Sequence, residues 1–369
     1  MNIDGHDLGV DELERHNASL DAVGSVRLVE LQDGSERGIR VIEFRNAAGL
    51  AFEVMVDRAM DIGSAGYRGR EFAWRSPTGF RHPAFHEYSD EGGLSWLRSF
   101  SGLTVTAGLD HTLFTAVSDA SHHNYPHRST IWNGLHGRVA NIPARLLGHG
   151  VEKRDGGIIL WAEGVVNQAA VFGEYLTLRR RIECDADGNE IRVIDRVRNS
   201  GFDQQPHMLL YHINFGWPLL AEGTRFVAPI IETLWRTDSV SKQGASHIVM
   251  PPPQKDFVEQ VYEHSLGVGS DHRTSAMLVN DRLEWAVEYV WDARVFPCFF
   301  QWLHLREGSY AIAFEPSTNH VGGRPDAEED QSLIWLDHGE ERVYQSSFVV
   351  HSGTAQIAAA EDLCIGRGG

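Results

Sequence analysis

Cysteine and long apolar runs are both scarce in this sequence. The three cysteines, Cys184, Cys298 and Cys364, lie far apart without CxxC spacing, which argues against a disulfide framework and a zinc ribbon. No run approaches the ~18 consecutive apolar residues of a transmembrane helix. The first 20 residues are polar and acidic, unlike a signal peptide. These features predict a soluble, cytoplasmic protein.

Positive charge is also in short supply. The chain carries 33 Lys and Arg against 51 Asp and Glu, for a net charge of −18 at pH 7 with neutral histidines. Nucleic acids and anionic membranes bind basic patches, so we expect neither as a partner. A hydrophobic fraction of 42%, with 10 Trp and 17 Phe, is ample for a large core.

Helical periodicity is rare, and strand and turn patterns take its place. Only residues 10–17 and parts of 86–98 favour helix. Short extended runs are joined by Asp/Gly and Asn/Gly turns, as in "SVRLVELQDGSERGIRVIEFRNAAGLAFEVMV". Such runs recur from about residue 25 to 353 without a low-complexity linker. The expected fold class is all-β and antiparallel, with few short helices.

The strand pattern is continuous enough to predict one domain over residues 1–369. Within it we expect an N-terminal extension (1–20), a β body (21–355) and a C-terminal tail (356–369). The stretch "GGRPDAEED" (322–330) is interpreted as a loop because glycine, proline and acidic residues cluster there.

The stretch "LLYHINFGWPLL" is apolar enough for a buried strand but contains polar side chains. With period-two alternation, Tyr211, Ile213 and Phe215 share one face, while His212 and Asn214 share the other. One interpretation is a histidine satisfied by a neighbour inside the core. The other is the floor of a polar binding cleft.

Two further stretches carry candidate acid–base and binding groups. His136 lies among glycines in "NGLHGRV", with Arg138 two residues on, so it is either exposed in a cleft or an ordinary turn histidine. Glu315 ends an apolar strand, where Ala311 and Ala313 on its face leave room for a ligand. An apolar setting raises a carboxyl pKa toward the range of a general base. The alternative is a salt-bridged glutamate at a sheet edge.

Other polar residues allow a structural and a functional interpretation equally. Gln301 and Trp302 in "FFQWLHL" form a pairing common in sugar sites and in β cores. In "VMVDRAMDIG", Arg58 belongs either to a structural ion pair with a neighbouring aspartate or to a cleft.

Five stretches in order together resemble a known family. "EVMVDRAMDIGSAGYRG", "SGLTVTAGLDH", "NGLHGRVANIPA", "MLLYHINFGWPLL" and "IAFEPSTN" are similar to the motif set of aldose 1-epimerase-like proteins. More narrowly, they resemble a bacterial branch with "LYHINFG" and "EPxTN" signatures. The resemblance runs from about residue 20 to 353 and implies a galactose-mutarotase-like β-supersandwich whose concave face binds a pyranose.

The resemblance also implies roles for individual residues. His212 matches the family's general acid, Glu315 its general base, and His136 a histidine that holds the substrate. Gln301 lies where a sugar-contacting glutamine is expected, and Arg58 lies in the region of a ligand-binding arginine. The remaining candidate substrate-binding residues are Asn214 and Arg138. If the sugar carries an acidic group, we expect Arg58, Arg98 or Arg138 to bind it.

The implied activity is mutarotation, in which a base takes the proton of O1 and an acid protonates the ring oxygen. The expected partner is a neutral or mildly anionic sugar, and neither a cofactor nor a metal is required. Two alternatives stay open. One is an enzyme of another reaction type on the same scaffold, namely a sugar isomerase or a lyase that acts on a modified sugar. The histidine-rich stretch "SDASHHNYPH" leaves open that a metal assists such a reaction, although no strong ligand spacing is present. The other is a non-catalytic carbohydrate-binding protein.

Overall fold

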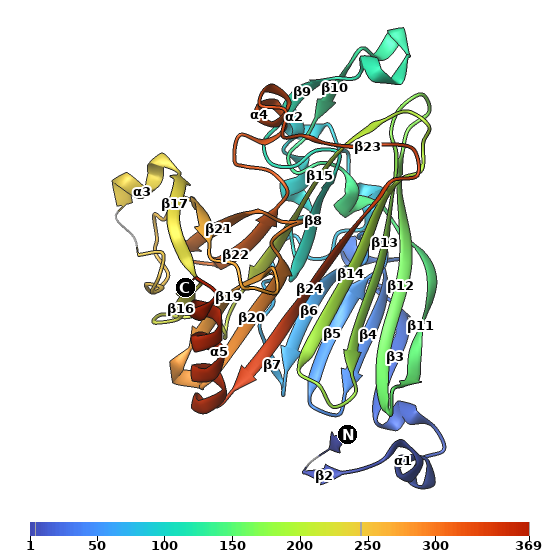
Figure 1. Cartoon of the computed structure of the whole chain (residues 1–369), viewed down its shortest axis with the longest axis vertical. Coiled ribbons are helices and arrows are strands. Elements are labelled where there is room, and N and C mark those ends of the chain that lie inside the picture. Colours follow the sequence, from blue (N-terminus) through green and yellow to red (C-terminus); the bar gives the residue numbers. More distant parts are fainter. Residues whose placement is uncertain (4, 244–245, 369) are drawn as a thin grey trace.

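The computed structural model describes residues 1–3, 5–243 and 246–368, and most of its regular structure is antiparallel sheet (Figure 1). The largest sheet has eight strands. In spatial order they are β11 (Arg145–Arg154), β12 (Gly157–Ala169), β13 (Tyr175–Asp185), β14 (Glu190–Asn199), β24 (Glu341–Ser352), β20 (Trp285–Asp292), β19 (Arg273–Asn280) and β16 (Arg225–Val227).

A seven-stranded sheet lies beside it and carries most residues of interest. Its strands are β17 (Ile230–Arg236), β18 (Gln260–Leu266), β21 (Cys298–Arg306), β22 (Ser309–Ser317), β15 (Gln205–Phe215) and β23 (Ile334–Leu336), with β8 (Thr104–Leu109) paired to β15. Because β15 is bordered by β8 on one edge and by β22 on the other, it is an interior strand.

A five-stranded meander completes the main body. It consists of β3 (Gly24–Glu30), β4 (Arg40–Asn46), β5 (Leu50–Met55), β6 (Asp61–Tyr67) and β7 (Arg70–Glu71). The short pairs β1 (Asn2–Ile3) with β2 (His6–Asp7) and β9 (Ala116–Asp119) with β10 (Thr130–Asn133) lie outside these sheets. The expected all-β, antiparallel architecture is confirmed.

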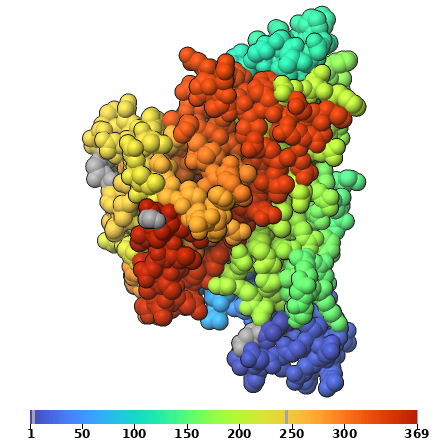
Figure 2. All heavy atoms as spheres, viewed as in Figure 1, coloured from blue at the N-terminus to red at the C-terminus, as the bar shows by residue number. Residues whose placement is uncertain are grey.

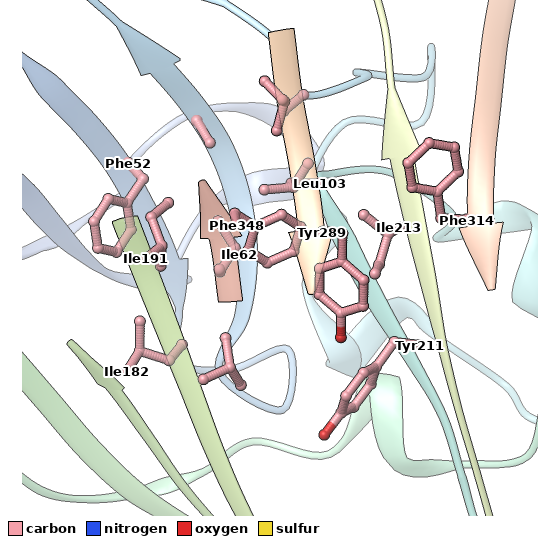
Figure 3. Packing of buried hydrophobic residues seen from close by; sticks show 14 of the residues in the cluster. Phe52, Ile62, Leu103, Ile182, Ile191, Tyr211, Ile213, Tyr289, Phe314 and Phe348 are labelled. Carbon is pink, nitrogen blue, oxygen red and sulfur yellow. The ribbon is translucent and has the colours of Figure 1, made fainter. Parts of the chain in front are cut away.

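The core lies between the eight-stranded sheet and the other two sheets. Figure 3 shows Ile182 and Tyr289 of the large sheet, Ile62 of the meander, and Ile213 and Phe314 of the seven-stranded sheet within one cluster. All five side chains are fully or almost fully buried. Burial of such side chains stabilises the fold by ~1.5–3 kcal/mol each, so the sandwich is held mainly by this apolar layer.

The helices are short, as expected. They are α1 (Val10–His16), α2 (Asp90–Gly93), α3 (Asp238–Gln243), α4 (Gly323–Glu329) and α5 (Thr354–Gly366). The first matches the helix predicted at 10–17, and α2 with the adjoining 3-10 turn at Ser95–Arg98 falls within 86–98. The stretch interpreted as a loop at 322–330 instead contains α4. Its Arg324 donates to the Asp110 carbonyl (3.1 Å) and to Glu328 (2.8 Å), which anchors the segment.

The expected C-terminal tail is for the most part a helix. Residues Ile357, Ala360 and Cys364 of α5 are buried against β16, β19 and β20. Figure 2 shows this dark red segment at the surface, beside the part of the chain coloured orange. Among the described residues, no helix combines the length and apolarity needed to cross a membrane.

Candidate functional site

The floor of the candidate site is β15, whose residues are buried from end to end. Tyr211, Ile213 and Phe215 belong to the main core cluster, while His212 lines a cavity on the other face. The side chain of Asn214 is hydrogen-bonded to His212 on that face. The alternation expected from "YHINF" is therefore present, and the cleft interpretation of His212 matches its position.

Asn214 holds the His212 ring in one tautomer. Its Nδ2 donates to the carbonyls of Gly102 (3.0 Å) and His212 (3.1 Å), which leaves Oδ1 to accept from His212 Nδ1 at 2.6 Å. A neutral imidazole carries one N–H, so Nε2 then has a free lone pair. This assignment follows from the hydrogen-bond pattern and makes Nε2 the atom that exchanges protons with the cavity.

Glu315 faces that nitrogen from the neighbouring strand β22. Its Oε1 lies 3.3 Å from His212 Nε2, and both side chains are almost fully buried. Ala311 and Ala313, on the same face of β22, pack with aromatic residues of the cavity wall. Small side chains thus precede the carboxylate on its face of β22, and Glu315 itself lines the cavity.

Burial shifts both groups toward their uncharged forms. It lowers the pKa of His212 to about 3, although the hydrogen bond to Asn214 acts in the opposite direction. It raises the pKa of Glu315 well above the ordinary value, and the negative charge of Glu259 adds to that rise. Burial therefore favours an uncharged pair, with a proton on Glu315 and none on His212 Nε2.

His136 enters the same cavity from the turn that follows β10. Its backbone is left-handed (φ 58°) and is held by hydrogen bonds from His136 N to Leu113 O and from Gly108 N to His136 O. The next residue, Gly137, also has positive φ, and a Cβ there would lie 2.5 Å from the Gly108 carbonyl oxygen. Only glycine fits that position, so the turn fixes the direction of the His136 side chain.

The His136 ring lies against the aromatic wall, with its centroid 4.6 Å from Trp96 and 5.7 Å from His212. Its Nδ1 is buried without a hydrogen-bond partner. Burial, with the nearby His212, lowers the pKa of His136 well below its ordinary value. The ring is thus neutral near pH 7 and offers an unused polar atom in a buried position.

The cavity shared by these residues has a volume of about 310 Å³ and is mostly apolar. It is lined by Leu94, Trp96, Leu97, Phe100, Leu113, Phe114, Leu135, His136, His212, Trp235, Thr237, Glu259, Val261, Phe300, Trp302, Glu315 and Val321. This combination of an aromatic wall with a few polar groups is typical of small-molecule sites. No Arg or Lys of the described chain belongs to the lining.

Sequence reasoning missed several members of this wall. Trp96 and Phe100 lie in and just after a short 3-10 turn, and their rings stack at 4.3 Å. Glu259 lies in the loop before β18, where its Oε1 accepts from Trp302 Nε1 at 2.5 Å. The aromatic spacing of "SWLRSF" was the only available signal for the first two. Nothing local marks Glu259.

Gln301 was expected in the cleft, but its side chain lies on the opposite face of β21. Its Nε2 donates to the His247 carbonyl (2.7 Å), and its Oε1 accepts from His264 Nε2 (3.3 Å). The neighbours Phe300 and Trp302 line the cavity instead. Because side chains alternate along a strand, Gln301 cannot share their face, and the structure does not bring it to His212.

Arg58 also lies outside the cavity lining, and its side chain binds backbone carbonyls of neighbouring segments. It is buried and donates to the carbonyls of Ala140 (3.1 Å), Arg81 (3.3 Å) and Ser99 (2.5 Å). Burial lowers its pKa to about 10. Since Ser99 adjoins Phe100, the guanidinium ties a wall segment to the meander rather than meeting a ligand.

The remaining arginines are likewise engaged elsewhere. Arg138 lies over the Tyr88 ring (4.0 Å) and approaches Asp110 at 3.9 Å. Arg98 pairs with Glu91 at 2.6 Å on the surface. Neither lines the cavity, so of the predicted residues the structure brings together His136, His212 and Glu315, with Asn214 bound to His212.

Comparison with solved structures shows which fold this is. A protein from Klebsiella pneumoniae, provisionally assigned as an aldose 1-epimerase, superposes with a TM-score of 0.84 at 22% identity, covering 94% of this chain and 88% of its own. A galactose mutarotase-like protein from Clostridium acetobutylicum superposes with a TM-score of 0.60 at 12% identity, and the match covers 89% of this chain and 98% of that protein. An aldose epimerase homologue from C. elegans superposes with a TM-score of 0.54 at 9% identity, and the match covers 85% of this chain and 99% of that protein. The fold is therefore galactose mutarotase-like.

At the level of sequence, the search among curated proteins found no match. A family model described as a domain of unknown function, DUF4432, matches residues 36–350, which is most of the chain. This protein therefore belongs to the DUF4432 family.

Proposed function

We propose that this protein is an aldose 1-epimerase that interconverts the anomers of an uncharged pyranose. The observation that carries the proposal is the contact between His212 Nε2 and Glu315 Oε1, 3.3 Å apart within a cavity of about 310 Å³. Mutarotation requires one proton acceptor at O1 and one proton donor at the ring oxygen, and this pair offers both.

The number of transferable protons on the His212–Glu315 pair suits the reaction. Because Nδ1 is committed to Asn214, the only mobile proton of the pair lies between Nε2 and the carboxyl of Glu315. Its transfer to Nε2 produces a carboxylate and an imidazolium. The carboxylate then removes the proton of O1, and the imidazolium protonates the ring oxygen as the C1–O5 bond breaks.

Ring closure returns both protons. The open-chain aldehyde rotates about C1–C2, and O5 attacks the other face of C1. His212 takes back the proton of O5 while Glu315 gives one to the new O1 hydroxyl. The pair is then again an imidazolium and a carboxylate, and return of the Nε2 proton to Glu315 restores its starting state. Atoms, charges and protons balance without a metal or an organic cofactor.

The lining of the cavity supports an uncharged substrate. Aromatic and aliphatic side chains dominate, and His136, Thr237 and Glu259 add polar groups to the lining beside the pair itself. An anionic sugar would lack a cationic partner and would meet the repulsion of Glu259. The apolar walls favour a pyranose that presents a C–H face or an apolar substituent to Trp96 and Trp302.

The test is a panel of neutral and anionic sugars followed by polarimetry and by exchange NMR between anomers. Acceleration of anomer exchange for a neutral pyranose, lost in Glu315→Gln, supports the proposal. A folded wild-type protein that binds such a sugar but accelerates no exchange would overturn it in favour of a binding protein. Formation of a new constitutional product would indicate an isomerase or a lyase.

A further inference from the structure

Three potential metal ligands converge on the seven-stranded sheet next to the cavity. Glu263 lies in the middle of β18, Cys298 begins β21, and His320 follows the end of β22. One ligand atom from each side chain lies within 4.8 Å of the other two. The three residues are far apart in the sequence, so only the strand pairing brings them together.

The strand register places this cluster on the face that carries the cavity. Trp235, Glu263, Phe300 and Glu315 are direct partners across β17, β18, β21 and β22, so they form one row on one face of the sheet. The other three members of this row line the cavity. Adjacent strands are ~4.8 Å apart, so the backbones at Glu263 and Glu315 are separated by roughly 10 Å.

The carboxylate of Glu263 is nearly fully buried and lacks a permanent cation. Its Oε1 is 2.5 Å from His320 Nδ1, and its Oε2 accepts from the Val321 backbone N–H at 3.4 Å. Among the described residues its only ion-pair partner is His320. Burial of a carboxylate is energetically unfavourable unless it is paired with a cation or bound to a metal. A metal ion bound by this cluster would therefore stabilise Glu263.

The thiol of Cys298 is the third group of the cluster, with its sulfur within 4.8 Å of a carboxylate oxygen of Glu263. Burial and the nearby Glu263 raise the pKa of Cys298 to about 12, so the thiol stays protonated beside the carboxylate. A bound divalent cation would lower the pKa of Cys298 again, because it stabilises the thiolate directly.

We propose that Glu263, Cys298 and His320 bind one Zn²⁺ ion. Carboxylate oxygen, thiolate sulfur and imidazole nitrogen are the ligands that zinc takes in proteins, and thiolate disfavours Mg²⁺ and Ca²⁺. Tetrahedral zinc with bonds of ~2.0–2.3 Å places ligand atoms roughly 3.3–3.8 Å apart, which the 4.8 Å cluster accommodates with small shifts. His320, whose side chain is 65% exposed, is free to make the largest shift.

Three protein ligands leave the fourth position of a tetrahedral ion open. The exposed side of His320 gives solvent access to that position, so a water or an oxygen of a small molecule would complete the site. Because Val321 lines the cavity and follows His320 directly, the ion would also fasten a cavity wall to β18. The site goes beyond the proposed epimerase and does not depend on it.

Metal binding by the full-length, tag-free protein tests the proposal. After chelation and removal of the chelator, the wild type should take up one equivalent of Zn²⁺, measured by competition with a chromophoric chelator and by elemental analysis. Co²⁺ should give the intense visible bands of a tetrahedral site together with a thiolate-to-cobalt charge-transfer band. Affinity should rise with pH because binding releases the thiol proton.

Variants distinguish zinc binding at this site from nonspecific zinc binding elsewhere on the protein. His320→Ala and Cys298→Ser should each weaken zinc binding by at least the ~10–100-fold that loss of a supporting partner costs, and Cys298→Ser should abolish the charge-transfer band. His338→Ala, which removes another exposed histidine, should leave both readouts unchanged. Because His320 is exposed, His320→Ala should fold even if Cys298→Ser does not. Absence of zinc uptake by the wild type, or uptake unchanged in His320→Ala, would overturn the proposal.

Discussion

His212 Nε2 and Glu315 Oε1 lie 3.3 Å apart, and Asn214 accepts the hydrogen bond from the opposite nitrogen of the same ring. The imidazole is therefore oriented from one side and left reactive on the other. Since both side chains are buried and no Arg or Lys of the described residues lines their cavity, the pair is electrically neutral as a unit.

Glu315→Gln should lower kcat for anomer exchange by at least ~10²-fold, because the amide keeps the shape of the side chain but cannot exchange the proton. His212→Asn should have an effect of similar size. The double variant should lose less than the sum of the two free-energy changes, since the residues act as one unit. Exchange NMR measures the rates, and sugar binding to Glu315→Gln should survive. Wild-type turnover by Glu315→Gln would exclude the mechanism.

The dependence of kcat/KM on pH should be bell-shaped and broad around neutrality. The active pair carries one proton, so the rate falls in acid when a second proton reaches His212, whose pKa burial lowers to about 3. It falls in alkali when the raised pKa of Glu315 is passed and the shared proton is lost. These limbs belong to the pair and not to either residue alone. A single acid limb at the ordinary histidine value of 6.5 would contradict this.

His136→Ala should weaken sugar binding as well as turnover. The variant removes both a ring that packs on Trp96 and a buried nitrogen without a protein partner, which we expect to bind a substrate hydroxyl. Loss of such a hydrogen bond costs ~0.5–1.5 kcal/mol, or roughly 2–10-fold in affinity. Calorimetric titration measures binding, and His338→Ala is the control. A fall in kcat alone would instead assign His136 to the chemical step.

Acid should destabilise the protein through its buried neutral histidines, and His207 provides the clearest case. Burial lowers its pKa from 6.5 to about 4, while Nδ1 and Nε2 contact Leu109 O and Tyr344 Oη. Between these values the unfolded chain binds the extra proton, so this contribution to stability is present above pH 6.5 and is lost as pH falls toward 4.

Chemical unfolding of the wild type and of His207→Gln at pH 7.5 and pH 5 measures this term. The wild type should lose about 2 kcal/mol more than the variant over that interval, because a pKa difference of one unit corresponds to ~1.36 kcal/mol. Equal losses in the two proteins would show that His207 does not titrate as the structure implies.

The sequence by itself determined the class of fold and the local geometry of the two central strands. Alternating runs with turn residues between them predict antiparallel sheet, and period-two alternation assigns His212 and Asn214 to one face of β15. The same rule places Ala311 and Ala313 before Glu315. These properties depend on neighbours along the chain, which is why a sequence pattern is enough to predict them.

Only the tertiary structure decided which strand faces and which loops meet at the cavity. Phe300 pairs with Glu315, so Gln301 points to the other face, and a register shifted by one residue would have exchanged the two. Trp96 and Glu259 come from a turn and a loop whose positions depend on long-range packing. The convergence of Glu263, Cys298 and His320 has the same origin, because strand pairing, unlike alternation, links residues that are distant in the chain.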